Sequence, residues 1–182
     1  MSAGHPHGTP TFEHARQYDA LLHEPWFQLA LERPYAVVIS YDLPYVGGSA
    51  VFNWRLNPRS YTDPPPLWSI YVDQHAYPII RDAGLLPGLV MHERVEGILL
   101  EHGWTYNEEP FAAHMIASVA EGRVNLARGI LPDEADRIYR PLIKADQHER
   151  LVRVPPDLHM EPYLAPPVDG RLVARMRAAM AA

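Results

Sequence analysis

The chain of 182 residues contains no cysteine. This absence excludes disulfides, thiolate metal ligands and cysteine nucleophiles together. A metal site in this chain would have to be built from its 10 histidines and 22 acidic residues.

The chain also lacks an excess of positive charge and a long hydrophobic run. Its formal net charge is −6 at pH 7 and no basic stripe is present, which argues against a nucleic-acid partner. No segment approaches the roughly 20 apolar residues of a membrane helix, and the N-terminus lacks the basic and apolar regions of a secretory signal. We therefore expect a cytoplasmic protein that binds neither nucleic acid nor membrane. Its oligomeric state is open.

Several motifs of common enzyme classes are missing. The sequence has no G-x-S-x-G, no P-loop and no G-x-G-x-x-G. It also lacks the paired E-x-x-H motifs of di-iron helix bundles, since Glu93 is followed three residues later by Glu96. Serine hydrolase, nucleotide-binding and di-iron functions are therefore disfavoured.

The composition is that of one folded domain. Hydrophobic residues make up 47% of the chain and charged residues 21%, as in globular proteins. The 19 prolines, about twice the usual proportion, predict long loops between short elements. We expect a disordered tail over residues 1–10, which includes His5 and His7, and a single α+β domain over residues 11–182.

The first half of the chain predicts one helical region and three strands. Thr11 is a candidate N-cap, and Pro25 interrupts the helical region. The double glycine Gly47–Gly48 predicts a turn, so the strands on either side of it are expected to form an antiparallel hairpin. The predicted elements are a helix or helix pair (11–34), strands (35–43, 49–56 and 67–73) and a loop (57–66).

The second half predicts helices. One runs from near Pro87 to a stop at Gly103, and the next begins at Asn107 as N-cap, with Pro110 tolerated in its first turn. A third is expected to break or kink at Pro141. The remaining predicted segments are that third helix (131–150), an extended proline-rich surface strap (154–170) and a final helix (170–182). The whole is an α+β fold with a short antiparallel sheet.

One predicted helix, GLVMHERVEGILLEHG (88–103), places charged groups among apolar ones. On a helical wheel His92 and Glu96 lie near the middle of the apolar face, whereas Arg94 and Glu101 lie on the expected solvent face. A buried carboxylate is costly unless it is paired or bound to a metal. Histidine and glutamate one turn apart can bind the same ion, and the neighbouring Glu93 is placed to act as general base toward a metal-activated water. The alternative is a metal-free core pair of His92 and Glu96.

These residues carry a resemblance. The motif HERVE (92–96) resembles the HExxH signature of zincin metallopeptidases, with glutamate in place of the second histidine. Together with Tyr106 and the pattern AHxxAxxxE (Ala113 to Glu121), it is also similar to small uncharacterised bacterial and phage proteins. The likeness covers about residues 67–125. It implies a zincin-like domain with a metal site and leaves the substrate undefined.

The third metal ligand has two candidates. His102 follows His92 by ten residues, as in metzincins, but Leu99 occupies the position where that motif turns on a glycine, and an unbroken helix directs His102 away from the ion. His114 follows His92 by 22 residues on the next predicted helix, which is the gluzincin arrangement. We therefore favour His114. The alternative is that His114 belongs to a solvated polar face.

Further residues are candidates for supporting roles. His114, Ser118, Glu121, Asn125 and Arg128 form a narrow polar stripe on a mostly apolar helix, which is also typical of a buried site. In that stripe, Glu121 is expected to orient His92 or a water from outside the ligand set. Outside the stripe, Tyr106 is a candidate hydrogen-bond donor to an oxyanion, or else a packed aromatic. Asp73 is a candidate to orient a ligand histidine; for Asp73 and for His75, ordinary loop hydrogen bonding is the alternative.

Two functions fit these observations. The first is a metal-dependent hydrolase, most simply a zinc metallopeptidase acting on a peptide or protein, with His92, Glu96 and His114 as ligands and Glu93 as general base. The strand at 67–73 is the candidate to hold an extended peptide by edge pairing. The second is a non-enzymatic metal-binding or phage-derived structural protein with a vestigial site. Two histidines and a carboxylate also suit iron or another divalent metal.

Overall fold

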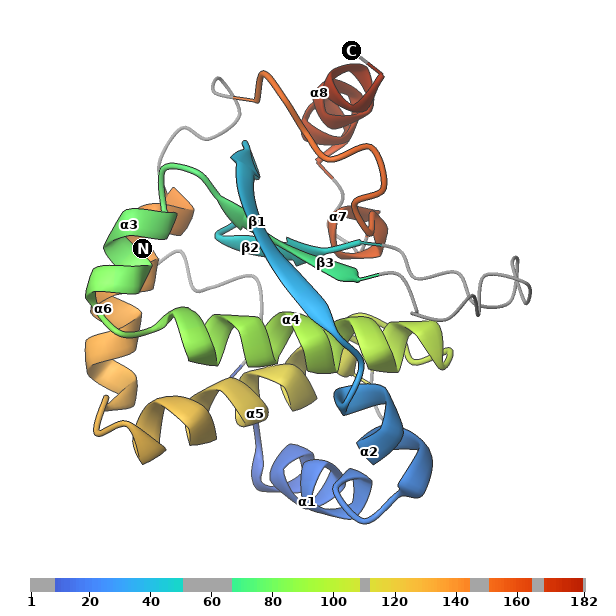
Figure 1. The fold of residues 1–182 in the computed structure, drawn as a ribbon, viewed down its shortest axis with the longest axis vertical. Helices are drawn as coiled ribbons and strands as arrows, with labels where there is room; N and C mark the ends of the chain where they lie inside the picture. The colour runs from blue at the N-terminus through green and yellow to red at the C-terminus, as the bar shows by residue number, and fades with distance from the viewer. Residues whose placement is uncertain (1–8, 51–66, 109–111, 145–150, 165–168, 182) are drawn as a thin grey trace.

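The computed structural model describes residues 9–50, 67–108, 112–144, 151–164 and 169–181. Over these residues the chain is a mixed α+β fold with one small sheet (Figure 1). Several predictions fall outside them: most of the predicted tail, the predicted strand beyond residue 50, the loop at 57–66, Pro110 and the end of the helix predicted at 131–150. None of the described helices has both the length and the apolar character that a membrane span needs.

The helical region at the N-terminus is a pair, which is one of the two predicted alternatives. Helix α1 (Phe12–Leu21) is capped by Thr11, whose side chain accepts a hydrogen bond from the backbone N–H of His14. Helix α2 (Pro25–Leu31) has Pro25 in its first turn, where no intrahelical N–H is lost. Phe27 of α2 is fully buried in the main core.

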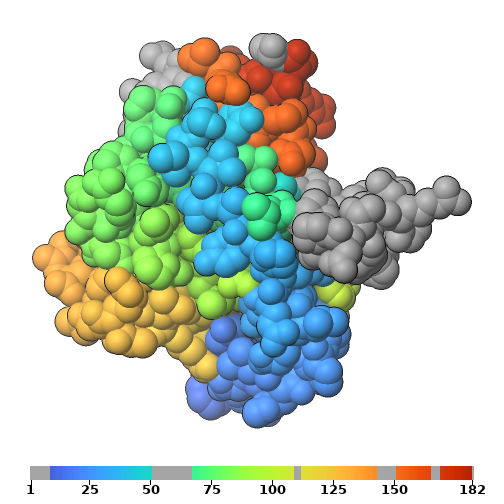
Figure 2. All heavy atoms as spheres, in the orientation of Figure 1, coloured from blue at the N-terminus to red at the C-terminus, as the bar shows by residue number. Residues whose placement is uncertain are grey.

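The sheet differs from the predicted hairpin. Strand β1 (Tyr35–Tyr41) pairs in parallel with β3 (Trp68–Asp73), and β2 (Gly47–Ser49) pairs antiparallel with the other edge of β3. The predictions of a turn at the double glycine and of an all-antiparallel sheet are therefore wrong. The most buried strand, β3, takes the centre, and Figure 2 shows β1 exposed across one face of the molecule.

Helix α4 (Leu86–Glu101) follows the short helix α3 (Tyr77–Asp82) and begins and ends where the sequence predicted. Pro87 lies in its first turn, and Gly103, just beyond its end, has a φ of 85° that favours glycine. The helix lies between the sheet and α5 (Figure 1). This position requires Gly97, because a Cβ there would lie 2.5 Å from Cζ2 of Trp68 on β3.

The expected solvent face of α4 is largely covered. Glu101 is ion-paired with Arg33, 2.7 Å away, and its side chain is only 6% exposed. The guanidinium of Arg94 lies 4.5 Å from the centre of the Tyr35 ring. Arg33, between α2 and β1, and Tyr35, the first residue of β1, therefore give both charged residues partners in the fold. Helical periodicity alone does not predict these partners.

Helix α5 (Ala113–Ala127) begins six residues after Asn107, so Asn107 is not its N-cap. Its N-cap residue is Ala112, which makes no side-chain cap. Instead, the N–H groups of Ala113 and His114 donate to the carbonyls of Thr105 and Tyr106, which fastens the start of α5 to the turn after α4.

Helix α6 (Pro132–Lys144) continues through Pro141, so the predicted break is wrong. The chain after it is less extended than predicted. It contains the short helix α7 (Glu161–Leu164), and Leu158 forms an isolated β-bridge with Ala50 before the final helix α8 (Gly170–Met180).

Replacing Gly97 with alanine is expected to destabilise the fold. Overpacking against Trp68 costs about 1–3 kcal/mol, more than the gain of about 1 kcal/mol in helix propensity. Gly122→Ala in α5 is the matched control, because no atom lies within 4 Å of its added Cβ, and it should stabilise. Urea denaturation of both variants measures the difference; equal stability would contradict the close approach of α4 and β3.

Candidate metal centre and cavity

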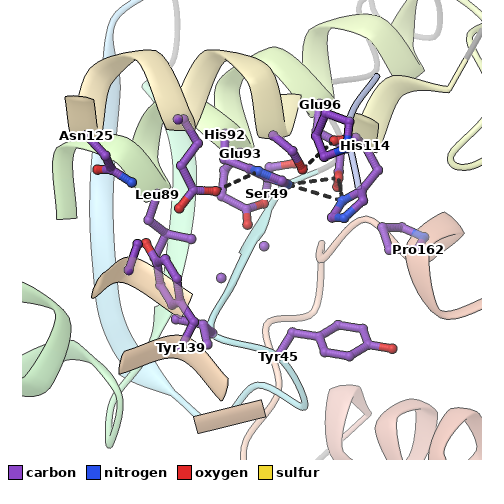
Figure 3. A pocket seen from close by; sticks show the side chains of 18 of the residues that line it. Tyr45, Ser49, Leu89, His92, Glu93, Glu96, His114, Asn125, Tyr139 and Pro162 are labelled. Atoms are coloured by element: carbon purple, nitrogen blue, oxygen red, sulfur yellow. Dashed lines mark hydrogen bonds and ion pairs between the residues drawn. The ribbon is translucent and has the colours of Figure 1, made fainter. Parts of the chain in front are cut away.

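Three side chains from two antiparallel helices converge on one point. His92 and Glu96 lie one turn apart on α4, and His114 lies at the start of α5 (Figure 3). Nε2 of His92 lies 3.3 Å from Oε2 of Glu96 and 3.2 Å from Nδ1 of His114, and the latter two atoms are 2.9 Å apart. The three residues that the sequence predicted as ligands are thus brought together.

The spacing of these three atoms fits a metal ion. A tetrahedral zinc ion with bonds of about 2.0–2.1 Å has ligand atoms about 3.3 Å apart, close to the two separations from Nε2 of His92, whereas the separation between His114 and Glu96 is shorter. Each residue offers one donor atom, and the group as a whole could hold an ion. Without a cation, the lone pairs of these nitrogen and oxygen atoms would repel one another unless a proton lies between them in a hydrogen bond. The donor set therefore fits a divalent metal.

Glu121 lies behind His92, on the side away from the other ligands. Its Oε2 is 3.0 Å from Nδ1 of His92, within ion-pair distance. A carboxylate at Nδ1 favours the tautomer that leaves Nε2 free to bind a metal. Glu121 therefore occupies the orienting position predicted from the sequence.

Glu93 sits beside the cluster against β2. It is 6% exposed, and a Cβ at Gly47 would lie 2.5 Å from its Oε1, so the glycine makes room for this carboxylate. Burial and the charge of Glu96 raise the pKa of Glu93 to about 8. A carboxyl group with a raised pKa is a competent proton acceptor and donor near neutral pH.

The other acidic groups of the site are held in their charged forms. Burial would raise the pKa of Glu96, but hydrogen bonds from His114 and His92 lower it to about 2. Burial would likewise raise the pKa of Glu121, but His92 lowers it. Burial lowers the pKa of His92, and Glu121 and Glu96 together hold it well above its usual value. The negative carboxylates and the positive His92 therefore stabilise one another's charged forms in the interior of the protein.

The cluster forms one wall of a cavity of about 390 Å³. The cavity passes along β2 and extends to both sides of the cluster: toward Leu89, Asn125 and Tyr139 on one side, and toward Tyr45 and Pro162 on the other (Figure 3). The donor set is therefore accessible to a ligand much larger than water.

The polar stripe predicted on the second helix faces this cavity. His114, Ser118, Glu121 and Asn125 all line it. Arg128 does not, and its Nε donates to the carbonyl of Gly84. The stripe therefore lines a buried site over most of its length, and the solvated-face alternative is wrong there.

The remaining predicted site residues divide into two groups. Tyr106 lines the cavity, and its ring centre lies 5.0 Å from that of His114. Asp73 is not brought to the cluster, because its carboxylate accepts from the backbone N–H groups of Leu43, His75 and Ala76. It therefore cannot orient a ligand histidine, and its role is the loop hydrogen bonding considered as the alternative.

His102 is likewise directed away from the cluster. Its Nδ1 lies 2.8 Å from the carbonyl oxygen of Ile98, and its ring packs against Trp26. As expected from the sequence, the unbroken helix around Leu99 directs His102 away from the other candidate ligands.

Several cavity residues were missed by the sequence reasoning. Gly47 and His159 carry no local signal, since the first looked like a turn and the second lies in a proline-rich strap. The N–H of His159 donates to the carbonyl of Ser49, which brings this strap to the end of β2. Tyr139 comes from α6. No pattern within one helix predicts that α6 lies close to α5. Comparison of the chain with protein-family models, curated proteins and solved structures finds no significant match.

The candidate metal centre predicts how much metal the protein contains. Protein purified without a histidine tag or chelators should contain one zinc ion per chain, and Glu96→Gln or His114→Ala should lose it. Elemental mass spectrometry measures the metal, and circular dichroism checks the fold. His102→Ala is the control that should retain the ion. Loss of metal from the His102 variant alone would contradict this ligand set.

Glu121 is expected to tune the affinity and not to supply a ligand. Glu121→Gln should keep the stoichiometry but weaken zinc binding about 10- to 100-fold, because the His92 ring loses its charged partner. Competition with a chromogenic chelator measures the affinity. An unchanged affinity would show that this ion pair does not support the site.

Proposed function

We propose that the protein is a metal-dependent hydrolase, most simply a zinc peptidase, with His92, Glu96 and His114 as ligands. The observation that carries the proposal is the convergence of three donor atoms, spaced as zinc ligands, on the wall of a cavity that also contains Glu93. A third ligand on a second helix is also what the resemblance to gluzincins implies.

The number of ligands favours catalysis over a purely structural site. Structural zinc is usually closed by four protein ligands, whereas catalytic zinc keeps a position for water or substrate. Among the described residues, the group that could hold an ion has three members. Their place on a cavity wall leaves access for a substrate carbonyl.

Glu93 has the central chemical role in this proposal. When bound, a divalent ion lowers the pKa of a water molecule and polarises a carbonyl oxygen. Glu93 would accept the proton released as water attacks the carbonyl carbon, and would return it to the nitrogen leaving group as the amide bond breaks. Its raised pKa suits both steps, because the proton is neither held too weakly nor too strongly.

In this proposal strand β2, and not β3, would hold an extended peptide. Both edges of β3 are occupied by neighbouring strands, so the expectation that 67–73 offers a free edge is wrong. Val46 and Ala50 bond to β3, so the alternation of an antiparallel ladder turns the N–H and C=O of Gly47 away from it. Gly47 lines the cavity, where these groups could pair with a substrate backbone.

The variant Glu93→Gln tests the catalytic proposal. It should keep zinc but lower kcat for a cleaved peptide by about 10²–10⁴, because an amide of the same size cannot accept the proton. A mixture of peptides incubated with the protein and read by mass spectrometry provides the assay. Cleavage that survives in Glu93→Gln, or that is absent from zinc-loaded wild type, would overturn the proposal.

A further inference from the structure

The cavity has a side pocket next to the candidate metal centre, which we define by Leu89, Glu121, Asn125, Ala135, Asp136 and Tyr139. In Figure 3 the labelled members Leu89, Asn125 and Tyr139 lie together on one side of His92 and Glu93. Leu89 and Ala135 give the pocket apolar walls as part of a small core cluster. Its polar members come from α5 and α6.

One polar group in the side pocket is buried without a partner. Oδ1 of Asn125 makes no hydrogen bond to any residue that the structure describes, although Asn125 is only 4% exposed. Burying such a group unsatisfied costs about 1–3 kcal/mol. Native proteins rarely accept that cost without a water or ligand that completes the hydrogen bonds.

The charges around the side pocket indicate whether that ligand carries a positive or a negative charge. Among the residues that the structure describes, the lining of the whole cavity contains the carboxyl groups of Glu93, Glu96, Glu121 and Asp136, and no lysine or arginine. The raised pKa of Glu93 leaves that group largely neutral at pH 7, so three of the four carry a negative charge. One divalent cation would offset two of these three charges. Asp136 lines the pocket and is ion-paired with Arg140, which lies outside the lining. A cationic group is therefore favoured there and an anionic group is disfavoured.

Tyr139 suits such a cation. Burial and the neighbouring carboxylate of Glu121 raise the pKa of Tyr139, so the group remains a neutral hydroxyl. A hydroxyl whose proton is drawn toward Glu121 directs its lone pairs elsewhere, and these can accept from an ammonium or guanidinium group.

The length of the side pocket distinguishes a long side chain from an α-amino group. Glu121 contacts the ligand His92, and Asn125 is four residues further along α5, about 6 Å along the helix axis. An extended lysine side chain spans about 6 Å, whereas an α-amino group stays next to the peptide bond. The apolar walls would contact the methylene groups.

We propose that the side pocket binds the basic side chain, lysine or arginine, of a peptide substrate beside the bond that is cut. The peptide nature of the ligand rests on the proposed function, whereas the preference for a long cation rests on the side pocket itself. Asp136 and Tyr139 are the specificity-determining residues, and Asn125 closes the end.

Binding of small probes tests the side pocket without any catalysis. N-acetyl-arginine amide and N-acetyl-lysine amide should bind about tenfold more tightly than N-acetyl-norleucine amide, as expected for hydrogen bonds to a charged group, and alanine amide should not bind. Titrations followed by amide NMR signals measure the affinities. Tyr139→Phe and Asp136→Asn should each remove most of the preference. Asp133→Asn, an exposed position on the same helix outside the lining, should leave it unchanged.

A peptide panel then separates this inference from the proposed function. The panel carries arginine, lysine, norleucine or glutamate at each position beside the cleaved bond. Cleavage with at least a tenfold preference in kcat/KM for the basic residues, lost in Asp136→Asn, supports both proposals. Cleavage without that preference overturns the side pocket and leaves the hydrolase. Binding of the arginine probe without any cleavage overturns the hydrolase and leaves the side pocket, and equal binding of the norleucine probe overturns the side pocket.

Discussion

The burial of Glu96 on α4 is the constraint on which the site depends. A carboxylate 6% exposed in the core of a small domain is costly unless positive charge or hydrogen-bond donors surround it. Here two histidine nitrogens lie within 3.3 Å of one of its oxygens, and one of those histidines is itself paired with a second, partly buried carboxylate. Each charged group is thus tolerable only because the others are in place.

This mutual dependence explains why α4 and α5 lie antiparallel to each other. Helix α5 supplies both His114 and Glu121, so it has to lie antiparallel along α4 for its first three turns. The turn at Gly103 and the hydrogen bonds from Ala113 and His114 to Thr105 and Tyr106 hold it there. Packing of the apolar faces and placement of the polar groups therefore favour the same arrangement, which is a mark of a well-specified fold.

Glycine decides how closely the sheet approaches the site. Gly97 lets α4 pack against Trp68, and Gly47 leaves room for Glu93 under β2. Both contacts bring the sheet close to α4. The result is a cavity lined by β2 along one wall, by the donor cluster on another and by the side pocket at one end.

The sequence by itself determined the local features. The helix bounded by Pro87 and Gly103, the pairing of α1 and α2 at Pro25, the polar stripe from His114 to Asn125 and the ligand candidates follow from periodicity, caps and spacing, which act over one or two turns. Strand order, the parallel pairing of β1 with β3, the edge position of β2 and the roles of Gly47, Tyr139 and His159 were decided only by the tertiary structure. These depend on contacts between segments far apart in the chain, and no local pattern records which strand takes the centre of a sheet or which helix closes a cavity.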